Sequence, residues 1–279
     1  MFARRRRRCL WRRRSLNTYR IKETDLSYSY LRKILVDNKL DAVLIGGWAV
    51  YLLVNSEFRR RNGFNYVGSR DIDIGFRLEP DWDKETLMES EFASALRKLK
   101  NLGFKPVSFR QQISYDYETL EILTGADLRN KPEHEIFRLY VDMVVNVIPE
   151  CFEEAFGFTP VDEPLLDLAF HQGKDHTVFI DDAGVRTVKS EVLLAMKLNS
   201  LPNRTRDDKR LKDISDIYAL SWYSGTRFNV IKHKLYGFYP REMVREVISS
   251  ITDGEYSSVS GFINVPKEEI ITVLSNLSK

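Results

Sequence analysis

A short apolar run that stops abruptly at two glycines constrains the fold of this chain more than any other feature. Residues 41–45 read Asp-Ala-Val-Leu-Ile, which is typical of a buried strand. Gly46 and Gly47 follow at once, and the apolar segment 48–54 after them predicts the start of a packed helix. A strand, a glycine turn and a helix in this order indicate a domain that mixes strands with helices.

Two aspartates alternate with apolar residues in the next extended segment. Residues 70–76 read Arg-Asp-Ile-Asp-Ile-Gly-Phe, the periodicity of a strand with one polar face. Asp71 and Asp73 are therefore expected on the same side, about 6.5 Å apart along the strand. A divalent cation with oxygen ligands, such as Mg²⁺, would relieve the repulsion between them. A solvated polar face is the alternative interpretation.

Asp142 and the glycine pair each have a structural and a functional interpretation. Asp142 stands in the apolar run Leu-Tyr-Val-Asp-Met-Val-Val, where an ionised carboxylate is costly to bury unless a metal or an arginine pairs with it. Gly46 and Gly47 let a backbone approach an anion closely, and the helix after them presents free N–H groups. The pair therefore predicts either a phosphate-binding turn or a tight turn without a ligand.

The periodicity of the chain changes near residue 188. Strands and helices are mixed before that point, whereas only helices are predicted after it. We expect a catalytic domain over residues 21–188, packed tightly against a helical domain over 189–279. The predicted helices are 25–38, 85–102, 191–201, 209–222, 229–236, 241–251 and 267–277, the predicted strands are 107–122, 137–148 and a hairpin over 178–188, and a loop is predicted over 58–68.

The positive net charge of the chain comes from its first 20 residues. They hold nine arginines and no acid, while the rest carries 34 basic and 40 acidic side chains. A dense block of like charges repels itself, so residues 1–20 are predicted to be a disordered basic tail. Binding to RNA or another polyanion, a targeting peptide and a start codon assigned too early are the three interpretations of this tail.

In this order, the motifs resemble the polymerase-β-like nucleotidyltransferase superfamily. The segments Ile45-Gly-Gly-Trp-Ala-Val and Ser69-Arg-Asp-Ile-Asp-Ile carry the resemblance. Ala195-Met-Lys197-Leu198 and Lys212-Asp213-Ile-Ser-Asp216 are similar to motifs of its AbiEii-type abortive-infection toxin branch. The resemblance covers about residues 40–220. It implies an α+β nucleotidyltransferase fold, a mixed sheet flanked by helices, followed by a C-terminal helical bundle.

The resemblance also implies roles for named residues. Asp71, Asp73 and Asp142 would hold two Mg²⁺ ions, with Asp142 also acting as general base. Lys197 would neutralise phosphate charge, and Asp213 would pair with Lys197 or touch the nucleotide. Solvated helix surface is the alternative for Lys197 and for residues 212–216, and a solvated loop for Arg59 to Arg61, which could otherwise meet phosphates. The implied catalytic set is Asp71, Asp73, Asp142, Lys197 and Asp213, and the implied nucleotide-binding set is Gly46, Gly47, Arg70 and Lys197.

The implied activity is Mg²⁺-dependent transfer of an NMP group from an NTP to a hydroxyl. The acceptor stays open between tRNA or another RNA, a protein and a small molecule of the antibiotic type, and a toxin of a toxin–antitoxin system would have a cognate antitoxin protein as partner. A non-catalytic nucleotide- or RNA-binding module is the alternative from another class. Two cysteines, no zinc-type spacing and no apolar run near ~20 residues predict a cytoplasmic protein without a membrane partner.

Overall fold

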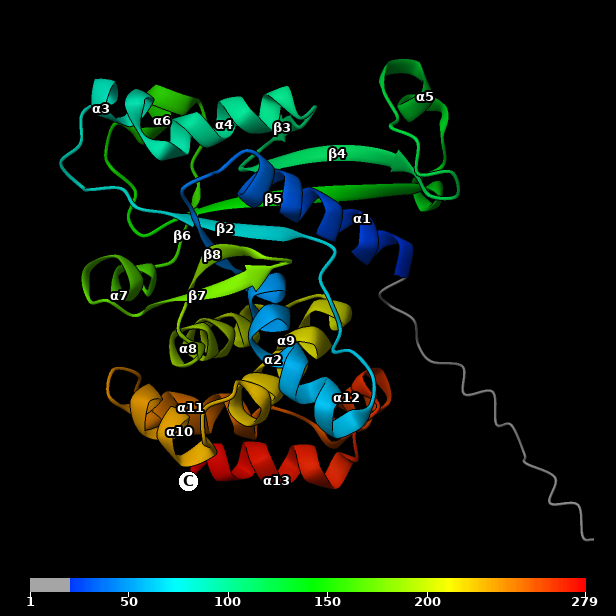
Figure 1. The fold of residues 1–279 in the computed structure, drawn as a ribbon, viewed down its shortest axis with the longest axis vertical. Helices are drawn as coiled ribbons and strands as arrows, with labels where there is room; N and C mark the ends of the chain where they lie inside the picture. Colours follow the sequence, from blue (N-terminus) through cyan, green and yellow to red (C-terminus); the bar gives the residue numbers. More distant parts are fainter. Residues whose placement is uncertain (1–20) are drawn as a thin grey trace, which may run out of the picture.

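The computed structural model describes residues 21–279, so the basic tail predicted for residues 1–20 lies outside the described residues. Within this range, eight strands form one mixed sheet with helices on both sides (Figure 1). The α+β class and the mixed sheet flanked by helices are therefore confirmed. The strands are β1 (Val43–Ile45), β2 (Ile72–Phe76), β3 (Lys105–Val107), β4 (Arg110–Asp116), β5 (Ile136–Val145), β6 (Val161–Asp162), β7 (Asp175–Ile180) and β8 (Ala183–Val188).

The strand order of the sheet brings the predicted aspartates together. The order is β3-β4-β5-β2-β1-β8-β7, with β6 paired to β5. Strands β2 and β5 are parallel, and their register places Asp73 beside Asp142. Strand β1 runs antiparallel to β2 with Ile45 opposite Asp73, so the glycine turn after β1 lies next to the same carboxylate.

Helices cover both faces of the sheet. In Figure 1, α3, α4 and α6 lie on one side and α2 and α8 to α13 on the other. The helices are α1 (Ile21–Arg32), α2 (Gly46–Asn62), α3 (Lys84–Glu89), α4 (Glu91–Asn101), α5 (Gly125–Asn130), α6 (Phe152–Phe156), α7 (Leu166–His171), α8 (Ser190–Ser200), α9 (Asp207–Tyr223), α10 (Phe228–Tyr236), α11 (Arg241–Ser249), α12 (Asp253–Ile263) and α13 (Lys267–Ser278), and a π-helical segment, Lys33–Asp37, extends α1.

Helix α9 is the central helix on the side of the sheet that carries α2 and α8 to α13 (Figure 1). It contacts α2, α8, α12 and α13, and every residue from Lys212 to Ser221 is buried. An ordinary surface helix buries one apolar stripe, whereas α9 also buries charged residues that must find partners. The position of these partners defines the site described below. No helix among residues 21–279 has the length and apolar character needed to cross a membrane.

Three local predictions were wrong in ways that the backbone explains. The loop expected over 58–68 begins as helix, because α2 continues through Arg59–Arg61 and ends where Gly63 adopts a φ of 82°. The helix expected over 85–102 is two helices, since the Ser90 side chain caps α4 by accepting a hydrogen bond from the N–H of Ala93. Helix α12 was not predicted, although Thr252 and Glu255 form a capping box at its start.

Candidate active site

A cavity of about 480 Å³ lies between the centre of the sheet and helices α8 and α9. The sheet and its loops supply one wall of this cavity, and the two helices supply the other. The cavity brings together most of the residues predicted from the sequence. Its lining includes Gly47, Asp71, Asp73, Asp142, Lys197 and Asp213, together with Ser69, Arg110, Arg204, Arg206, Lys209 and Lys212, which the sequence motifs had not assigned to the site.

The three carboxylates of the sheet wall have unequal partners. Arg110 on β4 donates two hydrogen bonds to Asp142, at 2.5 and 2.7 Å, because the antiparallel register places the two residues opposite each other. Lys209 on α9 donates to Asp71, which precedes β2, and a nitrogen of Arg110 lies 3.6 Å from the same carboxylate. The side chain of Asp73 makes no hydrogen bond or ion pair with any other residue in the range 21–279. The sheet wall therefore carries one carboxylate without a cation.

The pKa values of these aspartates reflect this arrangement. Burial in the cavity wall and the nearby charge of Asp71 raise the pKa of Asp73. Burial and the charge of Asp73 also raise the pKa of Asp142 to about 6, even though Arg110 opposes the shift. A cation added between these groups would favour their ionised forms. The wall is thus suited to binding positive charge.

The glycine turn permits this crowding. Gly46 has a φ of +66°, and a Cβ atom at this position would lie 1.9 Å from a carboxylate oxygen of Asp73. A Cβ atom on Gly47 would lie 2.8 Å from the side chain of Ser69. Steric crowding therefore requires glycine at both positions, because the carboxylate wall packs directly against the turn. Helix α2 begins here without a side-chain cap, so among residues 21–279 the N–H groups of its first turn have no side-chain acceptor.

The helix wall is a buried network of charges. Lys197 donates to Asp213 at 2.7 Å and lies 2.9 Å from Asp216. Lys212 lies 2.5 Å from Asp216, which also accepts a hydrogen bond of 2.9 Å from the hydroxyl of Tyr66. The four charged residues that α8 and α9 contribute to this network, Lys197, Lys212, Asp213 and Asp216, are each at most 8% exposed. The solvated-surface interpretation of Lys197 and of residues 212–216 is therefore wrong.

Paired charges set the pKa values in this network. Burial opposes ionisation of Asp213, but Lys197 and Arg204 outweigh it and lower the pKa of Asp213 to about 2. Burial likewise opposes the charge of Lys197, yet Asp213 and Asp216 raise its pKa. Lys212 differs, because burial and the nearby charge of Lys197 lower its pKa despite Asp216. The network contains two lysines and Arg204 against two aspartates, so it presents an excess of positive charge to the cavity.

Arg70 and the arginines of α2 lie elsewhere than expected. Arg70 lies 3.1 Å from Asp208 and 3.6 Å from Glu23, and it lines a neighbouring cavity. Arg60 and Arg61 pair with Glu57 one turn earlier in α2. Sequence reasoning did not assign Lys209, Lys212 or Arg110 to the site, and these cations differ in how far the sequence could have indicated them. The spacing of Lys209 and Lys212 from Asp213 and Asp216 on one helix could have indicated a shared face, whereas the pairing of Arg110 with Asp142 needs the strand register.

A metal ion fits the chemistry of the sheet wall, although the side chains now hold one another. Among residues 21–279, no three carboxylate, histidine or cysteine side chains are grouped so that they could hold a metal ion. Arg110 pairs with Asp142, and Lys209 pairs with Asp71. The carboxylate oxygens of Asp71, Asp73 and Asp142 are donors of the type that Mg²⁺ prefers.

Comparisons with known proteins include a remote structural likeness. A scan against protein-family models gives no match, and no curated protein matches the chain. Among solved structures, the chain is similar to an antigenic nucleotidyltransferase-like protein from Paracoccidioides brasiliensis, with 15% sequence identity and a TM-score of 0.38. The likeness covers 83% of this chain and 95% of that chain. The functional conclusion therefore rests on the geometry of the site itself.

Proposed function

We propose that this protein is a Mg²⁺-dependent nucleotidyltransferase that moves an NMP group from an NTP to a hydroxyl acceptor. The observation that carries the proposal is the division of charge across one cavity. Three carboxylates with two cations face two lysines and an arginine with two carboxylates. An NTP bound with a divalent cation has the same division, since its phosphates are negative and its metal is positive.

The triphosphate would bind along the helix wall and the glycine turn. The ammonium nitrogen of Lys212 lies 3.7 Å from the position that a Cβ atom on Gly47 would occupy, so this lysine reaches the start of α2. Free N–H groups at a helix start bind phosphate oxygens. Lys197 lines the same cavity from α8 and would add a second cation. Asp213 and Asp216 would hold the two lysines in place and keep them charged.

The metal would bind at the sheet wall. Asp71 and Asp73 would hold a first ion, and Asp142 would complete the site and help to hold a second ion. The bound metal would supply charge neutralisation at the phosphates that take part in the transfer. Lys209 and Arg110 would release the carboxylates and turn their donors toward phosphate oxygens. Both cations line the cavity.

The transfer step follows from these positions. The acceptor oxygen forms a bond to the α-phosphorus, and the bond from this phosphorus to the bridging oxygen breaks. The electron pair of that bond leaves with pyrophosphate, and the proton of the hydroxyl passes to Asp142. The products are the NMP ester of the acceptor and pyrophosphate.

A labelling experiment tests this proposal. The full chain is incubated with each α-labelled NTP, Mg²⁺ and separate pools of RNA, protein and small hydroxyl compounds. We expect label on one pool, loss of labelling with Asp73→Asn, and normal labelling with Asp182→Asn, a matched change in the exposed turn between β7 and β8. NTP binding without transfer to any pool would contradict the enzyme and favour a non-catalytic binding module.

An abortive-infection toxin is the biological role that the motif resemblance supports. It is carried by Ala195-Met-Lys197-Leu198 and by Lys212-Asp213-Ile-Ser-Asp216, both of which line or support the cavity. Induced expression of the wild-type chain should then arrest growth, and Asp73→Asn should not. Equal growth of both strains at equal protein levels would contradict a toxin without affecting the proposed chemistry.

A further inference from the structure

A side cavity of about 160 Å³ adjoins the active-site cavity at Asp73, Lys197 and Arg204, which line both. We propose that this side cavity holds the nucleobase of the NTP, and that the carboxylate of Glu163 selects a base with an exocyclic amino group. The inference rests on the proposed nucleotidyl transfer and deepens it by naming the class of NTP. Adenine, cytosine and guanine carry an exocyclic amino group, whereas uracil does not.

The side cavity lies next to both walls of the active-site cavity. Asp73 belongs to the sheet wall, where the metal is proposed to bind, and Lys197 belongs to the helix wall, where the triphosphate is proposed to bind. Gly46, at the start of α2, also lines the side cavity. Because a single ribose joins the base to the α-phosphate, the base must lie close to the groups that hold the phosphates and the metal. The side cavity meets this requirement.

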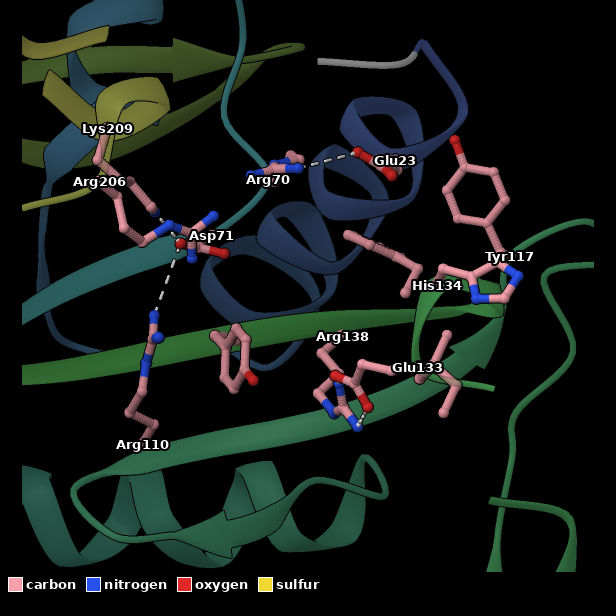
Figure 2. A pocket seen from close by; sticks show the side chains of 13 residues that line it. Glu23, Arg70, Asp71, Arg110, Tyr117, Glu133, His134, Arg138, Arg206 and Lys209 are labelled. Carbon is pink, nitrogen blue, oxygen red and sulfur yellow. Dashed lines mark hydrogen bonds and ion pairs between the residues drawn. The ribbon is translucent and has the colours of Figure 1, made fainter. Parts of the chain in front are cut away.

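A neighbouring cavity of about 390 Å³ differs from the side cavity in what it shares with the active-site cavity (Figure 2). The side chains that line both are all charged: Asp71, Arg110, Arg206 and Lys209. Figure 2 shows Arg110 and Lys209 reaching Asp71 from different sides. Neither Asp73 nor Lys197 lines this neighbouring cavity. A neutral base would have to lie among paired charges there, so we place the base in the side cavity.

Apolar side chains from the sheet and from α8 line the side cavity. Val144 on β5 and Val161 on β6 are paired neighbours in the sheet, and Leu193 and Met196 belong to α8. Val161 is 41% exposed, although burial of an apolar side chain is favourable. The faces of a nucleobase are flat and largely apolar, so a bound base would cover Val161. The apolar lining therefore suits the faces of a base and leaves its polar edge to a polar residue.

Glu163 supplies a hydrogen-bond acceptor for that edge. It lines the side cavity directly after β6, and its backbone N–H donates to the carbonyl oxygen of Val145 at 2.8 Å, which fixes its position beside the sheet. One carboxylate oxygen accepts a hydrogen bond of 3.1 Å from the N–H of Leu165. Within the described range 21–279, no lysine, arginine or histidine forms an ion pair with Glu163. An ionised carboxylate has about four acceptor sites and no donor, so it can bind an amino group and would repel a carbonyl oxygen.

The environment of this carboxylate favours a further donor. Burial raises the pKa of Glu163, although the hydrogen bond from Leu165 opposes the shift. A hydrogen bond to the ionised form lowers a pKa, so an amino group of the base would offset the cost of burial. A carbonyl oxygen in the same place would add repulsion, and the base of UTP would therefore bind less well.

Isothermal titration of NTPs into the full chain tests the inference without requiring transfer. ATP, CTP, GTP and UTP are titrated with Mg²⁺, together with the analogue of the tightest-binding NTP that lacks its amino group. The wild type should bind the amino-bearing NTP about tenfold more tightly than the analogue or UTP, in keeping with one hydrogen bond to a charged group. Glu163→Ala should abolish this preference, and Glu163→Gln, whose amide oxygen still accepts, should restore part of it. Glu246→Ala, at an exposed glutamate of α11, is the matched control and should keep it.

Inorganic triphosphate measures the phosphate half of the site separately. It should bind equally well to the wild type, Glu163→Ala and Val161→Ser, because it carries no base. Val161→Ser should weaken the binding of every NTP about threefold or more, since it removes apolar surface that the base would cover. If Val161→Ser weakened triphosphate as much as the NTPs, the apolar lining would not hold the base.

The outcomes separate this inference from the proposed function. A preference for the amino group that Glu163→Ala removes and Glu246→Ala keeps would support the side cavity as the base site. UTP binding as tight as that of every other NTP, or a preference that Glu163→Ala leaves unchanged, would overturn the inference even if the protein transfers NMP. Loss of the preference in Arg138→Ala, which alters the cavity of Figure 2, would also overturn it, because the base would then lie there. If neither triphosphate nor any NTP binds, the proposed function itself fails and the inference falls with it.

Discussion

The two walls of the active-site cavity are built from the same residue types and differ in how completely their charges are paired. On the sheet wall, three aspartates meet Arg110 and Lys209, and Asp73 has no partner among the described residues. On the helix wall, two aspartates are each held by two cations. The sheet wall therefore has one more carboxylate than cations, and the helix wall has one more cation than carboxylates.

The pKa values of two aspartates express this difference. Asp142 on the sheet wall has a pKa raised to about 6, while Asp213 on the helix wall has a pKa lowered to about 2. Burial acts in the same direction on both, so the partners decide the sign. The helix wall is stabilised as it is, whereas the sheet wall would be stabilised by an added cation. Functional groups commonly show this kind of local instability.

The largest expected effect comes from the unpartnered carboxylate. Asp73→Asn should lower the transfer rate by about 1,000-fold or more, because metal-supplied charge stabilisation is worth several kcal/mol. The free energy of unfolding should not fall, since the substitution removes a carboxylate whose raised pKa shows that its ionised form is disfavoured. Initial rates with labelled NTP and denaturant unfolding measure the two quantities.

A large loss of stability in Asp73→Asn would contradict the comparison between the walls. Asp182→Asn controls for the loss of an aspartate, because this residue lies exposed in the turn between β7 and β8. Gly46→Ala should reproduce the loss of activity, since a Cβ atom there would meet the carboxylate of Asp73. Unlike Asp73→Asn, it should also destabilise the protein, because residue 46 has a φ of +66°.

The helix wall should show the opposite pattern. Asp216→Asn should lower the free energy of unfolding by about 3 kcal/mol or more, because it leaves Lys197 and Lys212 buried with fewer negative partners. Asp216 is fully buried, and both lysines lie within 3 Å of it. Urea unfolding of the metal-free protein measures this loss. An unchanged midpoint would mean that water or a neighbouring group replaces the lost charge.

The helix-wall network was partly readable from the sequence. Helical spacing predicts that Asp213 and Asp216 are close to each other on α9, and a motif resemblance singled out Lys197. The prediction that Asp213 pairs with Lys197 agrees with the hydrogen bond of 2.7 Å between them. Asp216 also accepts a hydrogen bond from Tyr66, which is 150 residues away in the chain, and no local pattern indicates this contact. Contacts within one helix follow from spacing, whereas contacts between elements depend on packing.

On the sheet wall, too, the sequence predicts the local element but not the contacts between elements. Alternation predicts a strand at Asp73, and β2 begins one residue before it. The family resemblance implied that Asp73 and Asp142 share a metal site. Their closeness depends on β2 and β5 being parallel neighbours, which the local sequence does not indicate. The role of Gly46 was interpreted as access for phosphate, and its contact with Asp73 was not foreseen. That contact exists because β1 and β2 are paired in one register.

The pH dependence of the free energy of unfolding should also differ between the two walls. The pKa of Asp213 is about 2 in the folded state, compared with about 3.9 for an aspartate in an unfolded chain. A lowered pKa stabilises the fold above the unfolded value, and this contribution, about 3 kcal/mol, is lost as the pH falls from about 4 toward 2. Wild type should therefore lose stability more steeply over this interval than Asp213→Asn, as measured by urea unfolding in EDTA. Parallel profiles would contradict the pairing.

Lys212 is the position where the two walls and the glycine turn meet, and its replacement should give the smallest effect. Lys212→Met removes a cation near Gly47, so NTP binding should weaken about tenfold, in keeping with about 1.5 kcal/mol for a hydrogen bond to a charged group. Asp216 keeps Lys197 and Tyr66 as partners, so less stability should be lost than in Asp216→Asn.

Titration of a fluorescent NTP in Mg²⁺ measures this change, and Lys100→Met at the exposed end of α4 is the matched control. The lowered pKa of Lys212 makes the result informative, because burial already disfavours its charge. A bound triphosphate would reverse that balance by supplying negative charge. If Lys212→Met bound NTP as tightly as the wild type while Asp216→Asn unfolded, the excess cation of the helix wall would serve stability, and the triphosphate would have to lie elsewhere in the cavity.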